Sequence, residues 1–424
     1  MNIPIIVSLV LFAAVYVALT TEIINKTAAV LLGAMIMVFA GIIDQEAAFG
    51  HIDWNVIFLL IGMMIIMNIT RQTGLFQYVA IKIARFSRGE PLVILILLSL
   101  VTALFSAFLD NVTTVLIIVP ITILIAVELG ITPVPFVVTI AIASNIGGTA
   151  TMIGDPPNIM IGSAAGLGFI DFIVNLAPVV LVILVVFCAM VALFFRKQLK
   201  VSNERKARIM NFDETKAIED PKLLVKSLSV IGFVVLGFLL HGGLHLEAST
   251  IALSGAVVLI IISGKKELEH LFAELEWTTI FFFIGLFMLV GGLVEVGVMA
   301  KASAWLIGAT AGHLRLTQFV VLWFSGILSA IVDNIPFVAT MIPLIKDMGA
   351  QLGPAAVEPL WWTLALGACL GGNGTLIGAS ANVVSAGLSA KSGHPISFWD
   401  FTKYGVIFTI MSLLVSTLYV FIRY

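Results

Sequence analysis

Two Asp-Asn pairs interrupt long apolar runs of this sequence. Asp110 and Asn111 stand in SAFLDNVTTVLIIVP, which begins at Ser106, and Asp333 and Asn334 stand in SAIVDNIPFVATMIP, which begins at Ser329. On insertion scales an aspartate inside a bilayer costs about 2.5 to 3.5 kcal/mol, so such a residue is typical of a functional group that faces a cavity or a partner. In a poorly solvated pocket it could carry a proton. The structural alternative is that each aspartate caps the half-helix that follows it, and both roles can hold together.

A glycine-rich segment follows each pair. SNIGGTATMIGDPPNIMIG begins at Ser144 and LGGNGTLIGASANVVSAG begins at Leu370. Pro156 and Pro157 stop a helix, and the glycines loosen it, so each segment predicts a helix that is broken inside the membrane. Broken helix ends can hold ions with their free amides and carbonyls. Asp155 could serve such a site or only the turn before Pro-Pro.

Composition restricts the chain to membrane proteins. It has 424 residues, of which 60% are hydrophobic and 11% charged, and its mean hydropathy is +1.15. Apolar runs of about twenty residues recur, which predicts spanning helices and excludes a barrel of short alternating strands. The first run, residues 3–19, is expected to be a retained helix and not a signal peptide. Lone glycines in these runs, such as Gly33 and Gly62, are expected to allow close helix packing.

Several classes of function find no support. Two cysteines cannot form a disulfide scaffold or a Cys-rich metal site, and Cys369 is expected to serve helix packing. The glycine clusters lack the Lys-Ser or Lys-Thr ending of a phosphate-binding loop, so an ATP-driven pump is not indicated. The sequence therefore predicts neither an enzyme nor a bound metal or cofactor, and it shows no nucleic-acid-binding patch.

The chain is a repeat of two halves around one polar stretch. Residues 196–226 contain nine Lys or Arg, so they are expected to be a cytoplasmic, solvated connector. Asp53-Trp54 and Glu276-Trp277 are 223 positions apart (276 − 53), as are Asp110 and Asp333 (333 − 110). We therefore predict a first repeat over 1–197, a linker over 198–226 and a second repeat over 227–424.

Each half is expected to cross the membrane five times, because its Asp-Asn hairpin re-enters without crossing. An odd number of crossings inverts the second half relative to the first and places both termini outside the cell. The fold class is thus an all-α polytopic membrane protein. The expected elements are helices at 3–20, 27–43, 54–71 and 172–195, a hairpin within 91–129 and a broken helix over 134–165, then helices at 228–241, 248–263, 277–294 and 404–422, a hairpin within 317–350 and a broken helix over 360–390.

The motifs DNVTTVLIIVP and IGDPPN, with their repeats DNIPF and NGTLIGASAN in the second half, resemble those of the ion transporter superfamily. The similarity covers nearly the whole chain and is to the branch that holds arsenite-antimonite efflux permeases, the P protein and NhaD-like sodium-proton antiporters. The resemblance implies a scaffold and a mobile transport domain, usually in a homodimer, with substrate and ions held between the hairpin tips and the helix breaks. The residues that it implies are Asp110, Asn111, Thr113 and Thr114, Asp333 and Asn334 at the tips, and Thr149, Thr151, Asp155, Asn158, Asn373, Thr375 and Asn382 at the breaks.

One departure from the superfamily bears on the substrate. Its dicarboxylate and citrate carriers have Ser-Asn-Thr at both tips, whereas this sequence has Asp-Asn, and two aspartates would repel a carboxylate substrate. We therefore expect a secondary active transporter of the plasma membrane that exports arsenite or antimonite. The coupling ion is H⁺ or Na⁺, Asp110 and Asp333 titrate, and Asn111 and Asn334 orient them. A sodium-proton antiporter, a citrate or organic-anion carrier and a P-protein-like anion conductance stay open, as does a cytoplasmic ATPase partner.

Overall fold

The described chain is helical throughout. The structure is a computed structural model that describes residues 3–21, 23–244, 246–264, 268–310 and 312–424, and no strand occurs in these ranges. Nine of the described helices are long and apolar enough to cross a membrane. The first half contains α1 Ile3–Thr21, α2 Lys26–Phe39, α3 Gln45–Gly50, α4 Trp54–Arg71, α5 Leu75–Phe86, α6 Pro91–Phe108, α7 Asn111–Glu128, α8 Val134–Gly148, α9 Pro156–Ala165 and α10 Phe169–Phe195.

The second half repeats this order after a short helical linker. The linker holds α11 Asn203–Met210 and the 3₁₀ turn η1 Glu214–Ala217. Trp54 and Trp277 begin equivalent helices 223 positions apart (277 − 54), as do Asn111 and Asn334 (334 − 111). The second half contains α12 Pro221–Leu244, α13 Ala248–Ser263, α14 Leu268–Ala273, α15 Trp277–Glu295, α16 Val298–Ala309, α17 Leu314–Ile331, α18 Asn334–Leu352, α19 Pro354–Gly371, α20 Ser380–Lys391 and α21 Phe398–Arg423.

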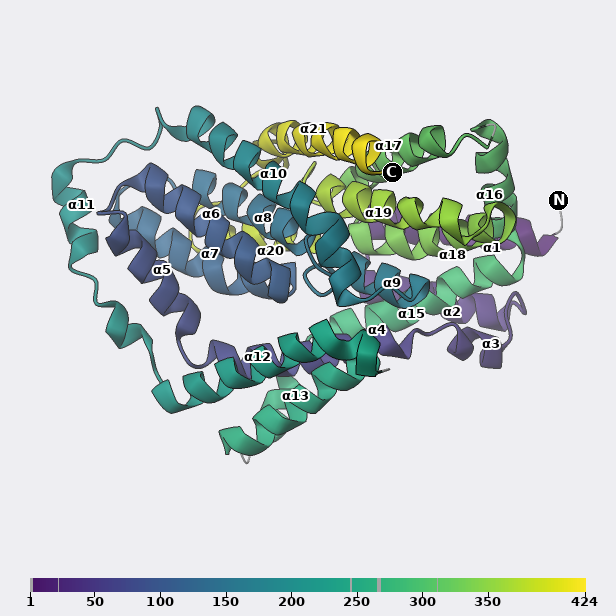
Figure 1. Ribbon diagram of the computed structural model, residues 1–424, viewed down its shortest axis with the longest axis horizontal. Coiled ribbons are helices and arrows are strands. Elements are labelled where there is room, and N and C mark those ends of the chain that lie inside the picture. The colour runs from purple at the N-terminus through teal and green to yellow at the C-terminus, as the bar shows by residue number, and fades with distance from the viewer. Residues whose placement is uncertain (1–2, 22, 245, 265–267, 311) are drawn as a thin grey trace.

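The two halves are interleaved in space. Helix α4 packs against α13 of the other half, and α15 packs against α2. The hairpin arms α6 and α17, in contrast, pack against α8 and α19 of their own halves. The second arm of each hairpin packs against the broken helix of the other half, α7 against α20 and α18 against α9. Figure 1 shows α10 and α21 crossing the same side of the molecule, where they are in contact. The opposite orientation of the two halves in the membrane stays a prediction.

Both predicted helix breaks are present. Helix α8 ends at Gly148 and α9 begins at Pro156, and α19 ends at Gly371 and α20 begins at Ser380. The four hairpin arms are 18 or 19 residues long, or about 27 Å at 1.5 Å per residue. Three of them, α6, α7 and α17, are long and apolar enough to span, so re-entry without crossing also stays a prediction.

Five helices, α3, α5, α11, α14 and α16, are absent from the predicted set. They have 6 to 12 residues, too few for the bilayer-length apolar runs that predict spanning helices. Helix α12 begins at Pro221, inside the predicted linker. The prediction missed its first turns because Lys222 and Lys226 interrupt the apolar pattern there. Helices α10 and α21 likewise begin three and six residues earlier than predicted, at Phe169 and Phe398.

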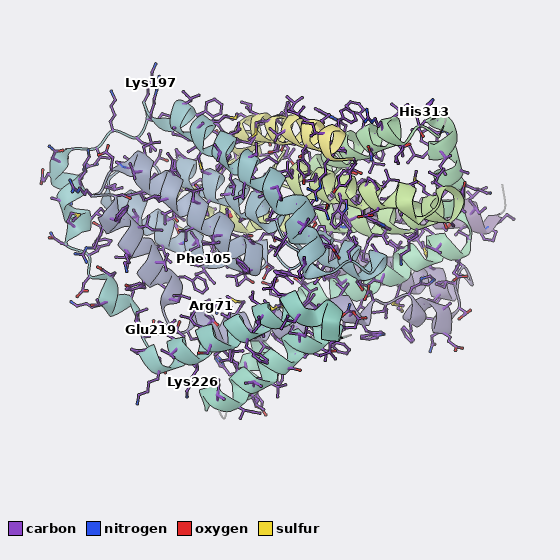
Figure 2. All side chains as sticks on the ribbon, viewed as in Figure 1. Arg71, Phe105, Lys197, Glu219, Lys226 and His313 are labelled. Atoms are coloured by element: carbon purple, nitrogen blue, oxygen red, sulfur yellow. The ribbon has the colours of Figure 1, made fainter. Side chains whose placement is uncertain are left out.

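The linker was predicted to be a solvated connector, but in the structure it packs against the first half. Arg205 Nη1 donates to the carbonyl oxygen of Gly130 over 2.8 Å, and Lys206 and Glu90 form an ion pair at the start of the first hairpin. Arg85 of α5 pairs with Glu214. Figure 2 shows Lys197 and Glu219 at one end of the molecule, with His313 at the other. Mixed charges therefore attach the linker to the protein and do not merely solvate it.

Glycines set the closest helix contacts. As predicted for a lone glycine, a Cβ at Gly62 would lie 2.7 Å from the backbone of Ala252 in α13. The glycine clusters do the same: a Cβ at Gly147 would collide with the carbonyl of Ala103 in α6, and one at Gly371 with Gly326 in α17. These backbones touch because a glycine on one side meets only alanine or glycine on the other.

We expect Gly147→Val to lower the free energy of unfolding by about 1 to 3 kcal/mol, because the added atoms force α8 away from α6. Thermal unfolding of the purified protein in detergent measures the loss. The control is Gly308→Ala in α16, where a Cβ meets nothing within 4 Å, so stability should be unchanged or higher. Equal melting temperatures for the two variants would contradict the close contact.

Candidate functional site

Both Asp-Asn pairs lie where one hairpin arm ends and the next begins, and both aspartates cap the following helix. Asp110 Oδ1 accepts the backbone N–H of Thr113 over 2.8 Å, and Asp333 Oδ1 accepts that of Ile335 over 3.2 Å. Thr114 Oγ1 donates to the Asp110 carbonyl over 2.9 Å. The capping alternative is therefore confirmed for both tips, which leaves each carboxylate one oxygen for other partners.

The two tips meet at Asp155. Asn111 Nδ2 lies 3.2 Å from Asp155 Oδ1, and Asn334 Nδ2 lies 3.4 Å and 3.3 Å from its two carboxylate oxygens. Asp155 is completely buried, and the hydrogen bonds found for it come from neutral amides. A buried carboxylate needs a compensating charge or a proton, so Asp155 is the group of this site most in need of a cation.

The sequence predicted that Asn111 and Asn334 orient the aspartates beside them. In the structure these amides do not bind those aspartates. The residue after a cap is rotated by about 100° around the helix axis, so its side chain leaves the helix in another direction. Asn111 and Asn334 therefore point away from Asp110 and Asp333 and toward Asp155.

Asn145 joins the two broken helices and was not predicted. Its Oδ1 accepts from Asn111 over 3.0 Å, and its Nδ2 donates to Asn373 Oδ1 over 2.9 Å and to Asn382 Oδ1 over 3.0 Å. It is fully buried on α8. The sequence signal for Asn145 is its place in SNIGG, about one turn before the predicted break.

Other predicted residues hold the breaks themselves. Asn158 Nδ2 donates to the carbonyls of Thr149 and Thr151 over 3.1 and 2.9 Å. Asn382 Nδ2 likewise donates to Gly372 and Thr375 over 2.8 and 3.0 Å. These amides satisfy backbone oxygens that a helix break would leave unpaired in the membrane.

Thr151, Thr375 and Cys369 make further contacts at the helix breaks. The Thr151 hydroxyl donates to the Ala107 carbonyl and the Thr375 hydroxyl to that of Ala330, which ties each break to its own hairpin arm. Cys369 does more than pack, since its Sγ lies 3.4 Å from Asn158 Oδ1.

A cavity of about 160 Å³ opens on this meeting point. Asp110, Asn111, Asp155 and Asn334 line it among the predicted residues. The other predicted residues do not line this cavity: Asp333 lines a neighbouring cavity, and the rest are Thr113, Thr114, Thr149, Thr151, Asn158, Asn373, Thr375 and Asn382. The 160 Å³ cavity is further lined by Leu60, Met64, Val112, Pro156, Glu276, Thr279, Ile335, Ser380 and Val384.

Glu276 adds a third carboxylate to this cavity. In the sequence, Glu276 belongs to the Glu-Trp pair that repeats Asp53-Trp54, and this pattern indicates only the internal repeat and not a site residue. Its hydrogen-bonded neighbour Thr279 donates to Oε2 over 3.0 Å. Since no lysine, arginine or histidine lines the cavity among the described residues, its charge favours a cation or an uncharged solute over an anion. No group of three His, Cys, Asp or Glu side chains in the described ranges could hold a metal ion.

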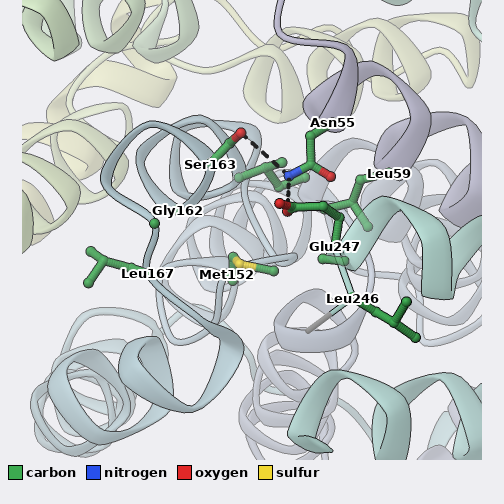
Figure 3. Close-up of a pocket in the computed structure, with 11 residues that line it drawn as sticks. Asn55, Leu59, Met152, Gly162, Ser163, Leu167, Leu246 and Glu247 are labelled. Carbon is green, nitrogen blue, oxygen red and sulfur yellow. Dashed lines mark hydrogen bonds between the residues drawn. The ribbon is translucent and has the colours of Figure 1, made fainter. Parts of the chain in front are cut away.

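A larger cavity, of about 470 Å³, lies beside α9 and contains none of the predicted residues (Figure 3). Asn55 Nδ2 donates to Glu247 Oε2 over 2.9 Å there, and Ser163 Oγ lies 3.5 Å from the same nitrogen. Met152 from the break and Ile159 from α9 are among its lining residues. We therefore place the candidate site in the smaller cavity.

Comparison with known proteins places the chain among transporters. The family model described as "Citrate transporter" matches residues 16–367. An uncharacterized transporter of Mycobacterium tuberculosis is 45% identical over 425 residues, which cover 99% of this chain and 98% of that protein. The 46 kDa membrane protein of Mycobacterium leprae is also 45% identical, over 99% of each chain.

Two more distant proteins extend this comparison. The human P protein is 33% identical over 98% of this chain and 59% of its own length. The crystal structure of the Alcanivorax borkumensis YdaH transporter superposes with a TM-score of 0.60 at 14% identity, covering 92% of this chain and 88% of that one. At that identity the YdaH structure supports the polytopic transporter fold alone.

Asn145→Ala should lower the free energy of unfolding by about 1 to 3 kcal/mol, because it removes one hydrogen bond from each of the buried side chains of Asn111, Asn373 and Asn382. The melting temperature in detergent reports the change. Thr122→Val is the matched control, since the equally buried Thr122 hydroxyl bonds only the Ile118 carbonyl of its own helix. An Asn145→Ala protein as stable as Thr122→Val would show that the asparagine network is not structural.

Proposed function

The chain belongs to the citrate transporter family, within the ion transporter superfamily, and we propose that it is a proton-coupled secondary active transporter working by alternating access. It is a multi-pass membrane protein of transporter type. One observation carries the proposal of coupling: Asp155 is buried between Asn111 and Asn334 and receives hydrogen bonds from neutral groups. A proton on this carboxylate removes the cost of burying its charge. Binding and release of that proton can therefore accompany the transport cycle.

Arsenite or antimonite is the substrate that we propose. Arsenite in neutral water is an uncharged trihydroxide, so it meets no repulsion from Asp110, Asp155 or Glu276. Its hydroxyls can donate to the carboxylates and accept from the amides of Asn111 and Asn334. The resemblance of the motifs to arsenite-antimonite efflux permeases supports the same choice.

Citrate is the second candidate, because the matching family model carries that name. A trivalent anion beside three carboxylates would have to bind in protonated form or with bridging cations. Sodium-proton exchange and a P-protein-like anion conductance are tested by the same preparation.

We expect proteoliposomes containing the protein to take up arsenite against its gradient when a proton gradient is imposed. Asp155→Asn should remove the dependence on the proton gradient and lower the rate by about tenfold or more, which is about 1.4 kcal/mol or more. Asp400→Asn, at an exposed residue of α21, is the control and should behave as the wild type. Proton-driven arsenite transport that survives in Asp155→Asn would overturn the role of Asp155.

The same vesicles separate the alternatives. Accelerated exchange with arsenite on both sides identifies a carrier, and its absence with flux present identifies a conductance. Proton-coupled uptake of citrate, or proton movement driven by Na⁺ without arsenite, would replace the proposed substrate.

We further propose a plasma-membrane location with the linker in the cytoplasm, both termini outside and a homodimeric assembly. A cytoplasmic ATPase, if it takes part, would meet the linker. The nine basic residues of 196–226 support this orientation.

In a Cys188→Ser background, Thr215→Cys should react with a membrane-impermeant maleimide only after cells are permeabilised, because Thr215 is exposed in the linker. Gln45→Cys, at the exposed first residue of α3, should react in intact cells. Cys369 is buried and gives a low background. The reverse labelling pattern would invert the proposed topology.

A further inference from the structure

Lys26 and Asp333 form an ion pair at the second hairpin tip that the sequence did not indicate. Lys26 Nζ lies 3.3 Å from Asp333 Oδ2, and Ser380 Oγ donates to the same oxygen over 2.8 Å. The Asp333 side chain is 7% exposed and that of Lys26 is 27% exposed. A carboxylate this buried is costly unless a charge compensates it, and Lys26 supplies that charge.

The lysine is held in place by the start of α2. Asn25 caps this helix by accepting the N–H groups of Thr27 and Ala28 over 3.0 and 3.3 Å. Thr27 Oγ1 donates to the carbonyl of Thr278 in α15 over 2.8 Å, which fixes the same turn to a second helix. Lys26 therefore projects from an anchored helix end and not from a loose loop.

The first hairpin tip has no such partner. Asp110 is equivalent to Asp333, and α13 is equivalent to α2, but α13 begins with Ala248 where α2 begins with Lys26. Among the described residues Asp110 makes no ion pair, and its carboxylate accepts the Thr113 amide. The repeat thus places a cation at one tip and none at the other.

Other titratable groups around the second tip do not replace the lysine. Tyr16 of α1 hydrogen-bonds Thr340 of α18 over 2.6 Å, about two turns beyond the tip. Asp155 reaches the tip through Asn334, and Glu276 lies in the adjoining cavity. These groups are neutral or acidic, so Lys26 is the cation that faces Asp333 among the described residues.

We propose that Lys26 is a built-in counter-cation of Asp333, so that the second tip needs no bound ion and the coupled cation is taken up at Asp110 and Asp155 alone. Lys26 is in this sense a positioning and specificity-determining residue, which acts through Asp333. The proposal rests on the proposed function. It implies that removing the lysine creates a demand for one more cation, either Na⁺ or H⁺, at the second tip.

The test compares Lys26→Met with the wild type, Lys26→Arg and the double variant Lys26→Met/Asp333→Asn. Lys403→Met is the matched control, because Lys403 and Asp400 form an exposed pair at 3.0 Å. Melting temperatures of the purified proteins are titrated with NaCl and LiCl against choline chloride, and against pH. Coupled cations per arsenite are counted in proteoliposomes.

Lys26→Met should be stabilised by Na⁺, Li⁺ or acid more than the wild type, and should couple one more cation per cycle. Lys26→Arg and the double variant should return to the wild-type response, because the first restores the charge and the second removes the need for it. An unchanged salt and pH response in Lys26→Met would overturn the proposal, as would an altered response that persists in the double variant. The melting titrations decide this even if the wild type transports no arsenite, a result that would count against the proposed function alone.

Discussion

The hydrogen bonds from Asn111 and Asn334 to the buried carboxylate of Asp155 are the contact on which the site depends. Each asparagine begins the second arm of a hairpin from a different half, so the carboxylate joins both halves at one point. The geometry requires both aspartates before them to turn back and cap their helices. It also requires a charge or proton that neutral amides do not bring. The structure of the site and the proposed ion coupling therefore depend on the same three side chains.

Close backbone contact makes this meeting point possible. Gly147 and Gly371 let the broken helices touch the hairpin arms, and the breaks that follow would expose carbonyl oxygens inside the bilayer. Asn158 and Asn382 bind those oxygens with their amides. Glycine and asparagine are thus complementary: the first allows the approach, and the second satisfies the backbone that the approach interrupts.

The two halves share a framework but differ in charge. Asp155 has Ala379 as its counterpart at the interval of 224 that relates the breaks (379 − 155), so one break carries a carboxylate and the other does not. The start of α13, Ala248 and Ser249, carries no cation in the place of Lys26. A symmetric framework with asymmetric charges gives two nonequivalent tips: the second has its compensating cation in the protein, and the first is where we propose that a cation from solution binds.

The sequence by itself determined the membrane class, the repeat, most long helices and both breaks, because hydrophobic length, proline and glycine act locally. It also placed Asp110, Asn111, Asp155 and Asn334 among the site residues. Only the tertiary structure decided that Asp155 stands at the centre, that Asn145 links the breaks and that Glu276 and Lys26 approach the tips. These contacts join residues from tens to hundreds of positions apart, such as Lys26 and Asp333, and no local pattern encodes which side chains face one another after two halves interleave.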